Sequence, residues 1–441
     1  MKKVLLSFAV WAVASASFAQ DLKIYKAEEL MEEKNYTEAQ KVIQDVIANP
    51  KTKKLAFAYF MAGEIEGRII NDQLEKMKSG TCDSTLFIQA LDNAIQYFTK
   101  SNEIDHQPDS KGRVKPKYLN KFEITPKNYP GNKKRIKDML KYYGQSASFE
   151  LRRQNKDSAL DYLIKGLELP KNPVFTKAET DSIYKKDKAY YNQLGYFIAM
   201  SYSEKKDYDN VLKYVDYAIK DKKSMRDGYL MKSEALLAKG DTATWLEVCK
   251  QATHDMPENL NYCQNVLKYY DDHKMVKEAT DMADELVKKS PDNKVAWYAR
   301  GCVYMNTIKN YEEARAAFSK ALEIDPNFTF AQFNQGCTYV NELMSIKDKL
   351  TTDRTKVEQY NADMAKAREY YRKALPYFEN SLVLDPERPQ LWGYNLQTVY
   401  YNLQDGELKE EMKQKEADMK KVQEGNMAGS DFITKYNITK K

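Results

Sequence analysis

The feature that most constrains the fold is the spacing of small and aromatic residues in residues 310–326, NYEEARAAFSKALEIDP. Steps of four and three residues separate Ala314, Phe318 and Ala321, so a helix would place them on one face. Two alanines beside an aromatic ring let a second helix approach closely and receive that ring. Pro326 then ends the helix. The stretch therefore predicts one helix of a tightly packed pair.

Prolines recur near the ends of Lys-, Ala- and Leu-rich segments, at Pro257, Pro291, Pro326 and Pro386. The first two intervals are 34 and 35 residues, and the third, of 60, equals one 34-residue period with 26 additional residues. A period near 34 residues in a helix-favouring sequence is typical of stacked helix–turn–helix repeats. We call the two helices of each repeat helix A and helix B.

The segment AWYARGCVYMNTIKNYEEARAAFSKALEIDP resembles one tetratricopeptide repeat, with one extra residue in its turn, NTIKN. The resemblance implies an all-α fold, a right-handed α-solenoid of such repeats, in an exported bacterial protein. It extends to about eight units, most clearly over residues 190–221, 226–257, 260–291 and 328–386. The signature residues of the quoted segment are Trp297, Gly301, Tyr304, Ala314, Phe318, Ala321 and Pro326.

The N-terminus has the order of a secretory signal peptide over residues 1–19: two lysines, the apolar run VLLSFAVWAVA, and small residues before Gln20. We predict cleavage between Ala19 and Gln20, and a mature protein that is periplasmic or secreted. The apolar run is too short for a membrane anchor. The first cysteine is Cys82, so we expect no lipid attachment near the cleavage site.

The rest of the chain divides by composition. We expect repeats over residues 20–106 and 132–404, separated by a basic, proline-rich linker over residues 107–131 that divides the array or serves as a docking loop. The 26 additional residues predict a long hairpin at about 345–370, turning near LTTDRT and projecting about 20 Å. A polar capping helix over 405–425 and a flexible tail over 426–441 complete the chain.

Charge and motifs exclude several classes of function. The 70 Lys and Arg residues are interspersed with 64 Asp and Glu residues, unlike the concentrated positive charge of nucleic-acid-binding proteins. No phosphate loop, metalloprotease or nucleophile-elbow motif is present. Cys249, His254 and Cys263 match no zinc-ligand spacing. We therefore predict no catalytic residues, no metal and no cofactor, and a protein that is not an enzyme.

Two covalent features have alternatives that the sequence leaves open. Adjacent repeats would bring Cys249 and Cys263 together, where they either form a disulfide or remain two buried thiols. Four Asp-Ser/Thr-apolar tripeptides resemble O-glycosylation motifs of exported bacterial proteins, although Asp at these positions also fits a helix N-cap. The acceptor residues would be Ser84, Ser158, Ser182 and Thr242.

In this family, one stripe of each helix A lines a concave groove that holds an extended peptide or a partner helix. We expect an apolar pocket there for a hydrophobic side chain of a partner, in a non-catalytic scaffold or adaptor of the cell envelope. The alternatives are that these rings only fill contacts between helices, or that abundant tyrosines bind a glycan. Some relatives hold a terminal carboxylate with Lys and Asn, which the equivalent positions here do not supply. The predicted groove residues are Tyr298, Cys302, Met305, Asn306, Phe330, Phe333 and Asn341.

Overall fold

The computed structural model describes residues 19–441 except 110, 119–120, 123–128 and 257–258. Almost all of the predicted signal peptide lies outside this range. The chain divides into two compact units, Met1–Asp241 and Thr242–Lys441, called here the N-terminal and C-terminal units. This division falls inside the repeat predicted over residues 226–257, not at the predicted linker. Within the described residues, no helix is both long enough and apolar enough to cross a bilayer.

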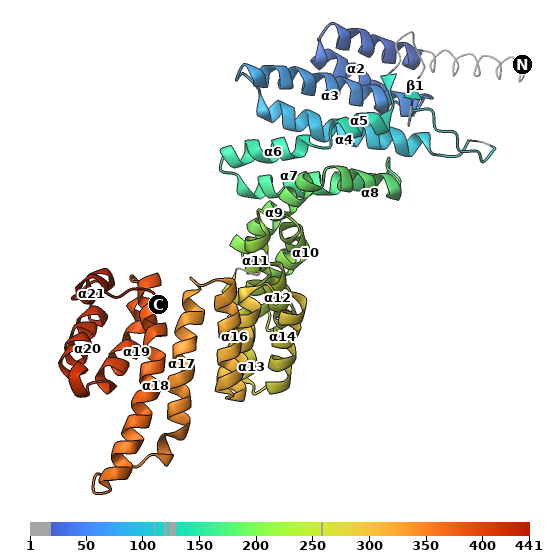
Figure 1. The fold of residues 1–441 in the computed structure, drawn as a ribbon. Coiled ribbons are helices and arrows are strands. Elements are labelled where there is room, and N and C mark those ends of the chain that lie inside the picture. The colour runs from blue at the N-terminus through green and yellow to red at the C-terminus, as the bar shows by residue number, and fades with distance from the viewer. Residues whose placement is uncertain (1–18, 110, 119–120, 123–128, 257–258) are drawn as a thin grey trace, which may run out of the picture. The chain divides into compact units, whose positions relative to one another are not determined.

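Helices that are successive in sequence pack in pairs in both units, as predicted for an all-α solenoid (Figure 1). The first helix among the described residues of the N-terminal unit covers residues 19–32. Its further elements are α2 (Tyr36–Ala48), α3 (Leu55–Lys78), α4 (Ser84–Asp105), β1 (Lys121–Phe122), β2 (Tyr129–Pro130), α5 (Asn132–Asp138), α6 (Tyr142–Arg152), α7 (Lys156–Glu168), η1 (Leu169–Lys171), α8 (Lys177–Lys186), α9 (Lys188–Glu204), α10 (Tyr208–Ile219) and α11 (Met225–Ala238).

The C-terminal unit continues the same arrangement, and its helix pairs are α13–α14, α15–α16, α17–α18 and α19–α20. Its elements are α12 (Thr242–Asp255), α13 (Leu260–Asp272), α14 (Val276–Lys289), α15 (Lys294–Cys302), η2 (Val303–Ile308), α16 (Tyr311–Ile324), α17 (Thr329–Ile346), η3 (Lys347–Lys349), α18 (Val357–Leu384), α19 (Pro389–Asn402), η4 (Gly406–Leu408), α20 (Lys409–Gln423) and α21 (Gly429–Tyr436).

A single left-handed residue other than glycine makes the turn between helix A and helix B in five repeats, and Gly240 takes the same place between α11 and α12. In four of the five the next residue is Asn or Asp, and in three of these its side chain accepts a hydrogen bond from the first turn of helix B; Asn310, for example, accepts from the Glu313 backbone N–H at 3.2 Å. The left-handed residue reverses the chain, and the cap starts the next helix. The five residues are Lys34, Gln154, Lys206, Lys274 and Lys309, with φ between 56° and 61°.

A glycine of helix A packs against an aromatic ring of helix B in several pairs. A Cβ atom on Gly301 would lie 2.5–2.8 Å from three atoms of the Phe318 ring, which is fully buried. The same contact joins Gly336 to Phe378, and Gly63 to Phe98. Only a glycine allows the ring to lie directly on the helix backbone. As predicted for a tightly packed pair, helix A receives the Phe318 ring of helix B within the same repeat.

The predicted linker over residues 107–131 does not divide the array, since it lies within the N-terminal unit. Its tyrosines, Tyr118 and Tyr129, are each only 6% exposed, and Tyr118 stacks on Phe57 at 6.1 Å between ring centroids. The Tyr129 hydroxyl donates to Glu28 at 2.6 Å. The antiparallel pairing of β1 with β2 closes this loop. Proline, glycine and charge suggested a solvated linker, but the two aromatic side chains anchor the segment.

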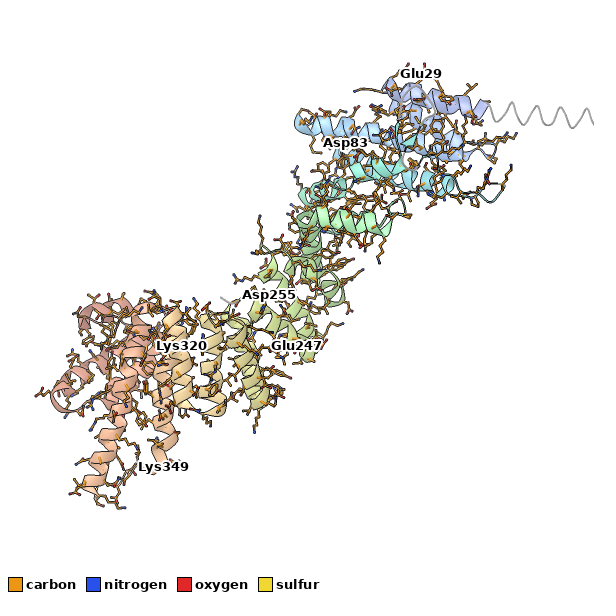
Figure 2. All side chains as sticks on the ribbon, turned by 45° about the vertical axis from the view of Figure 1, so that its right-hand side comes forward. Glu29, Asp83, Glu247, Asp255, Lys320 and Lys349 are labelled. Atoms are coloured by element: carbon orange, nitrogen blue, oxygen red, sulfur yellow. The ribbon has the colours of Figure 1, made fainter. Side chains whose placement is uncertain are left out.

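The 26 additional residues form the predicted hairpin, because α17 has 18 residues and α18 has 28. Its turn covers residues 347–356, around the predicted LTTDRT. The hairpin extends past the end of α16 in Figure 1, and Figure 2 places Lys349 near its far end. The Asp363 carboxylate accepts a hydrogen bond from the Thr351 backbone N–H at 2.8 Å, which fastens the turn to α18.

The tail over residues 426–441 is ordered, so the expectation of a flexible segment was wrong. It forms α21, and Phe432 in that helix is fully buried against Tyr400 at 6.1 Å between ring centroids. Asn380 exchanges two hydrogen bonds with the Lys441 backbone, at 2.8 and 3.1 Å. The predicted capping helix corresponds to α20, and α21 packs beyond it.

Candidate partner-binding groove

A cavity of about 630 Å³ lies along the A helices of the C-terminal unit. Four consecutive A helices, α13, α15 with η2, α17 and α19, contribute side chains to it. We call it the groove cavity. Its lining residues are Gln264, Leu267, Lys268, Asp271, Tyr298, Cys302, Val303, Met305, Asn306, Thr307, Asn334, Cys337, Asn341, Tyr394 and Asn395.

Five of the seven predicted groove residues line this cavity: Tyr298, Cys302, Met305, Asn306 and Asn341. Tyr298 is only 4% exposed and packs on Phe318, with ring centroids 5.9 Å apart. It is therefore a core residue that also forms part of the floor. Packing between helices and lining a binding groove were predicted as alternatives. The Tyr298 ring does both.

Phe330 and Phe333 do not line the groove cavity. Phe333 packs on Phe378 at 5.6 Å between centroids, which repeats the contact of Tyr298 with Phe318 one unit later. Phe330 makes an edge contact with Phe328, and the Arg388 guanidinium lies over its ring at 5.5 Å. Of the rings and side chain of the predicted apolar pocket, the groove cavity therefore includes Tyr298 and Met305 but not these two phenylalanines.

The side chains that α17 does contribute are Asn334, Cys337 and Asn341. They follow one another at steps of three and four residues, which is the spacing of one helix face. That spacing is present in the sequence. The prediction placed the groove on the neighbouring face of the helix because that face carries two phenylalanines. Tyr394 and Asn395, from α19, were not predicted.

The extra residue predicted in the turn NTIKN is accommodated in helix A instead. The last turn of that helix, η2, is a π-helix, which carries one more residue per turn than an α-helix. Val303, Met305, Asn306 and Thr307 all line the cavity from this one turn. The wider turn therefore exposes Asn306 to the groove while Met305 stays buried.

Amide side chains dominate the polar part of the lining. The Asn334 amide donates to the Tyr298 hydroxyl at 3.1 Å and to the Cys302 sulfur at 3.5 Å. The side chains of Asn306, Asn341 and Asn395 make no hydrogen bond within the described part of the chain. Lys268 and Asp271 add one charge of each sign. The groove thus offers three amides that can donate and accept at once.

The cysteines of the groove are protonated at neutral pH. Burial raises the pKa of the Cys302 thiol to about 12, and that of Cys337 to about 12. Burial also raises the pKa of Cys263, and the charge of a Cys302 thiolate would raise it further. Thiols with such pKa values are poor nucleophiles and poor metal ligands.

The other predicted sites are scattered. The described residues contain no disulfide, so Cys249 and Cys263 are two buried thiols that no covalent bond joins. The three histidines lie near the C-terminal ends of different helices, and no group of three metal-binding side chains occurs among the described residues.

The four Asp-Ser/Thr motifs differ in setting. Asp83 caps α4 by accepting from the backbone N–H groups of Thr85 and Leu86 at 3.0 Å, and Thr242 begins α12. Asp157 lies in the first turn of α7, whose cap is Asn155. Asp181 lies inside α8, so the expected helix start there was wrong. Ser182 is exposed, whereas Ser84, Ser158 and Thr242 are half-buried.

Residues 295–328 match the family model of the tetratricopeptide repeat. The chain contains a tetratricopeptide repeat at these residues. The matched residues are those that form α15, η2 and α16, where Gly301 meets Phe318. No curated protein matches this repeat protein in sequence.

Several solved structures of tetratricopeptide proteins are similar to this repeat protein at low identity. A repeat protein from Bacteroides fragilis is 17% identical over 58% of this chain and 93% of that chain, with a TM-score of 0.30. The C-terminal part of a repeat-containing protein from Cytophaga hutchinsonii is 15% identical over 60% and 93%, with a TM-score of 0.29. Yeast Tom70 is 11% identical over 96% and 92%, with a TM-score of 0.26. Scores this low do not indicate a shared overall arrangement, so the identification rests on the matched repeat and its packing.

Proposed function

We propose that this protein is a non-catalytic scaffold of the bacterial cell envelope, which holds an extended segment of a partner protein in the groove of its C-terminal unit. The observation that carries the proposal is the set of amide side chains at Asn306, Asn341 and Asn395. They come from three successive A helices, line one cavity, and have no hydrogen-bond partner in the described chain.

An extended peptide is the ligand that such amides complement. Each peptide unit offers one N–H and one C=O, and a carboxamide can bind both. Neighbouring helices lie about 8–10 Å apart, and an extended chain rises about 3.3 Å per residue. Successive asparagines would therefore contact about every third residue of the peptide. Met305 and Leu267 supply apolar surface for a side chain between those contacts.

The test is a matched set of variants. A photoreactive phenylalanine derivative at the exposed position of Tyr394 would capture the partner segment from an envelope extract, and a peptide of that sequence would then be titrated. The double variant Asn306→Leu/Asn341→Leu should weaken binding by about 1–3 kcal/mol, since two hydrogen-bonding groups are lost. Asn361→Leu, on the exposed face of α18, is the control. Unchanged affinity in the double variant would contradict the proposal.

Glycan binding is the second candidate, because the Tyr394 ring is 72% exposed beside Asn395 in the same cavity. An exposed ring can stack on a sugar, and nearby amides can bind its hydroxyls. A glycan array decides between the two candidates. Saturable glycan binding that Tyr394→Ala abolishes, together with no captured peptide, would favour the glycan.

The envelope location rests on the proposed signal peptide, and N-terminal sequencing of the native protein tests it. We expect Gln20 as the first residue, because the small residues Ser17 and Ala19 fit a cleavage site after Ala19. Recovery of Met1, or of the protein in a cytoplasmic fraction, would contradict the proposed location while leaving the groove proposal intact.

A further inference from the structure

A second cavity, of about 510 Å³, lies in the N-terminal unit between the A helices α6 and α9, with α7 beneath them. We call it the N-terminal cavity. It is hollow because α6 contributes Ala147 and Ser148 where a larger side chain would fill the space, while Gly144 accommodates the Tyr190 hydroxyl. The facing stripe of α9 is large and apolar, and consists of Tyr190, Leu194, Phe197 and Met200. Ala159 and Leu163 of α7 form the floor.

Ion pairs lie at both ends of the N-terminal cavity, one between the α6 and α9 sides and two between the α7 floor and the end of α9. At one end Lys141 pairs with Asp187 at 2.8 Å. At the other end Lys156 pairs with Glu204 at 2.8 Å, and Lys205 pairs with Asp157 at 2.5 Å. From Tyr190 to Glu204 the wall of α9 spans about 20 Å. An occupant of this cavity therefore meets paired charges at each end of the apolar wall.

The lining of the N-terminal cavity is poorly suited to a peptide backbone. The Ser148 hydroxyl donates to the Gly144 carbonyl at 3.2 Å, and the Ser201 hydroxyl donates to the Phe197 carbonyl at 2.9 Å. The side chains of Gln145 and Gln193 make no hydrogen bond in the described part of the chain. Two amides cannot satisfy the groups of a peptide that fills the cavity, whereas a hydrocarbon chain has none to satisfy.

We propose that the N-terminal cavity binds one unbranched apolar chain of a single-chain amphiphile such as a fatty acid. The chain lies between the Gly144–Ala147–Ser148 wall and the Phe197–Met200 wall, and its polar end lies beside Gln145 and Gln193. The volume is within the range of about 300–1,000 Å³ that small-molecule sites occupy. Burial of each methylene group favours binding, so a chain that fills only part of the cavity still has measurable affinity.

The test uses cis-parinaric acid, a fluorescent straight-chain fatty acid, with palmitate as the competitor. The full-length protein should bind the probe saturably, and palmitate should displace it. Ser148→Leu, which fills the cavity from α6, should weaken binding by at least about tenfold. Ser201→Leu, from the opposite wall, should do the same. Ser203→Leu, on α9 but outside the lining, is the control and should bind as the wild type does.

Three results would overturn the proposal: no saturable binding by the wild type, wild-type affinity in both filling variants, or equal loss in the control. If one filling variant fails to fold, as shown by its helical circular dichroism, the variant on the opposite wall provides the same test. Hydrogen exchange needs no variant, since palmitate should protect amides of α6 and α9 in the wild type and leave those of α15 and α17 unchanged. Protection confined to α15 and α17 would place the fatty acid in the groove cavity and contradict the inference.

Discussion

Replacing Phe318 with alanine should lower the free energy of unfolding of the C-terminal unit by about 3–5 kcal/mol. The ring is fully buried, lies directly on the backbone of Gly301, and also contacts Tyr298. Its loss leaves a void between α15 and α16 that flanking repeats can close only in part. Urea unfolding followed by circular dichroism measures the loss. Hydrogen exchange in α15 and α16 locates it, since repeat arrays unfold locally as well as globally. The control is Phe330→Ala, which removes a half-buried ring and should lower the free energy of unfolding by less.

The contact with Gly301 allows a sharper form of this test. In the wild type, Gly301→Ala places a methyl group 2.5 Å from a ring atom and should destabilise the repeat. In the Phe318→Ala variant the same methyl group enters vacant space, so Gly301→Ala should be neutral or stabilising. Equal effects in the two backgrounds would show that the ring does not lie on the glycine.

Replacing Arg135 with methionine should destabilise the N-terminal unit by about 3–5 kcal/mol at neutral pH, because it leaves a buried carboxylate without its partner. The Glu64 side chain is 2% exposed, and Arg135 donates to both of its oxygens at 2.5 Å. Burial raises the pKa of Glu64 even with the guanidinium present, and without it this pKa should rise further.

The sign of the pH dependence follows from that raised pKa. Between the unfolded pKa, about 4.3, and the higher folded value, the folded variant binds more protons than the unfolded chain. The deficit in stability should therefore be largest at neutral pH and should shrink as the pH falls toward about 5. The control is Arg135→Met/Glu64→Gln, which has no carboxyl to titrate there. A deficit that is the same at both pH values would show that Glu64 stays ionised after the arginine is lost.

The structural roles that could be predicted from the sequence are those that depend on neighbouring residues in the chain. Gly301, Phe318 and Pro326 mark a repeat because sterics and helix geometry require those residue types at that spacing. The long hairpin could be predicted because the additional residues contain no helix-breaking residue before Pro376. Tyr118 and Tyr129 were missed because the surface that covers them comes from α3 and the helix over residues 19–32, far away in sequence.

The groove was predictable only in part for a related reason. Tyr298 and Phe333 have equivalent places in adjacent repeats, but only Tyr298 reaches the groove cavity, because the side chains that surround each ring differ. The N-terminal cavity gave no sequence signal, since it arises from small residues on α6 facing large ones on α9. The size of a cavity between two helices depends on the side chains of both helices. The residue pattern of one helix therefore cannot predict it.

The π-helix η2 and the α17–α18 hairpin accommodate additional residues in different ways, yet the glycine–phenylalanine contact is the same in both repeats. One inserted residue is absorbed within a single turn, and 26 are absorbed in a projection away from the stack. Changes in chain length at these two places therefore need not alter the spacing of neighbouring A helices. The hairpin leaves the lining side chains of α17 and α19 in place, whereas the π-helix also determines that Asn306 faces the groove cavity, so only the longer insertion is independent of the groove lining.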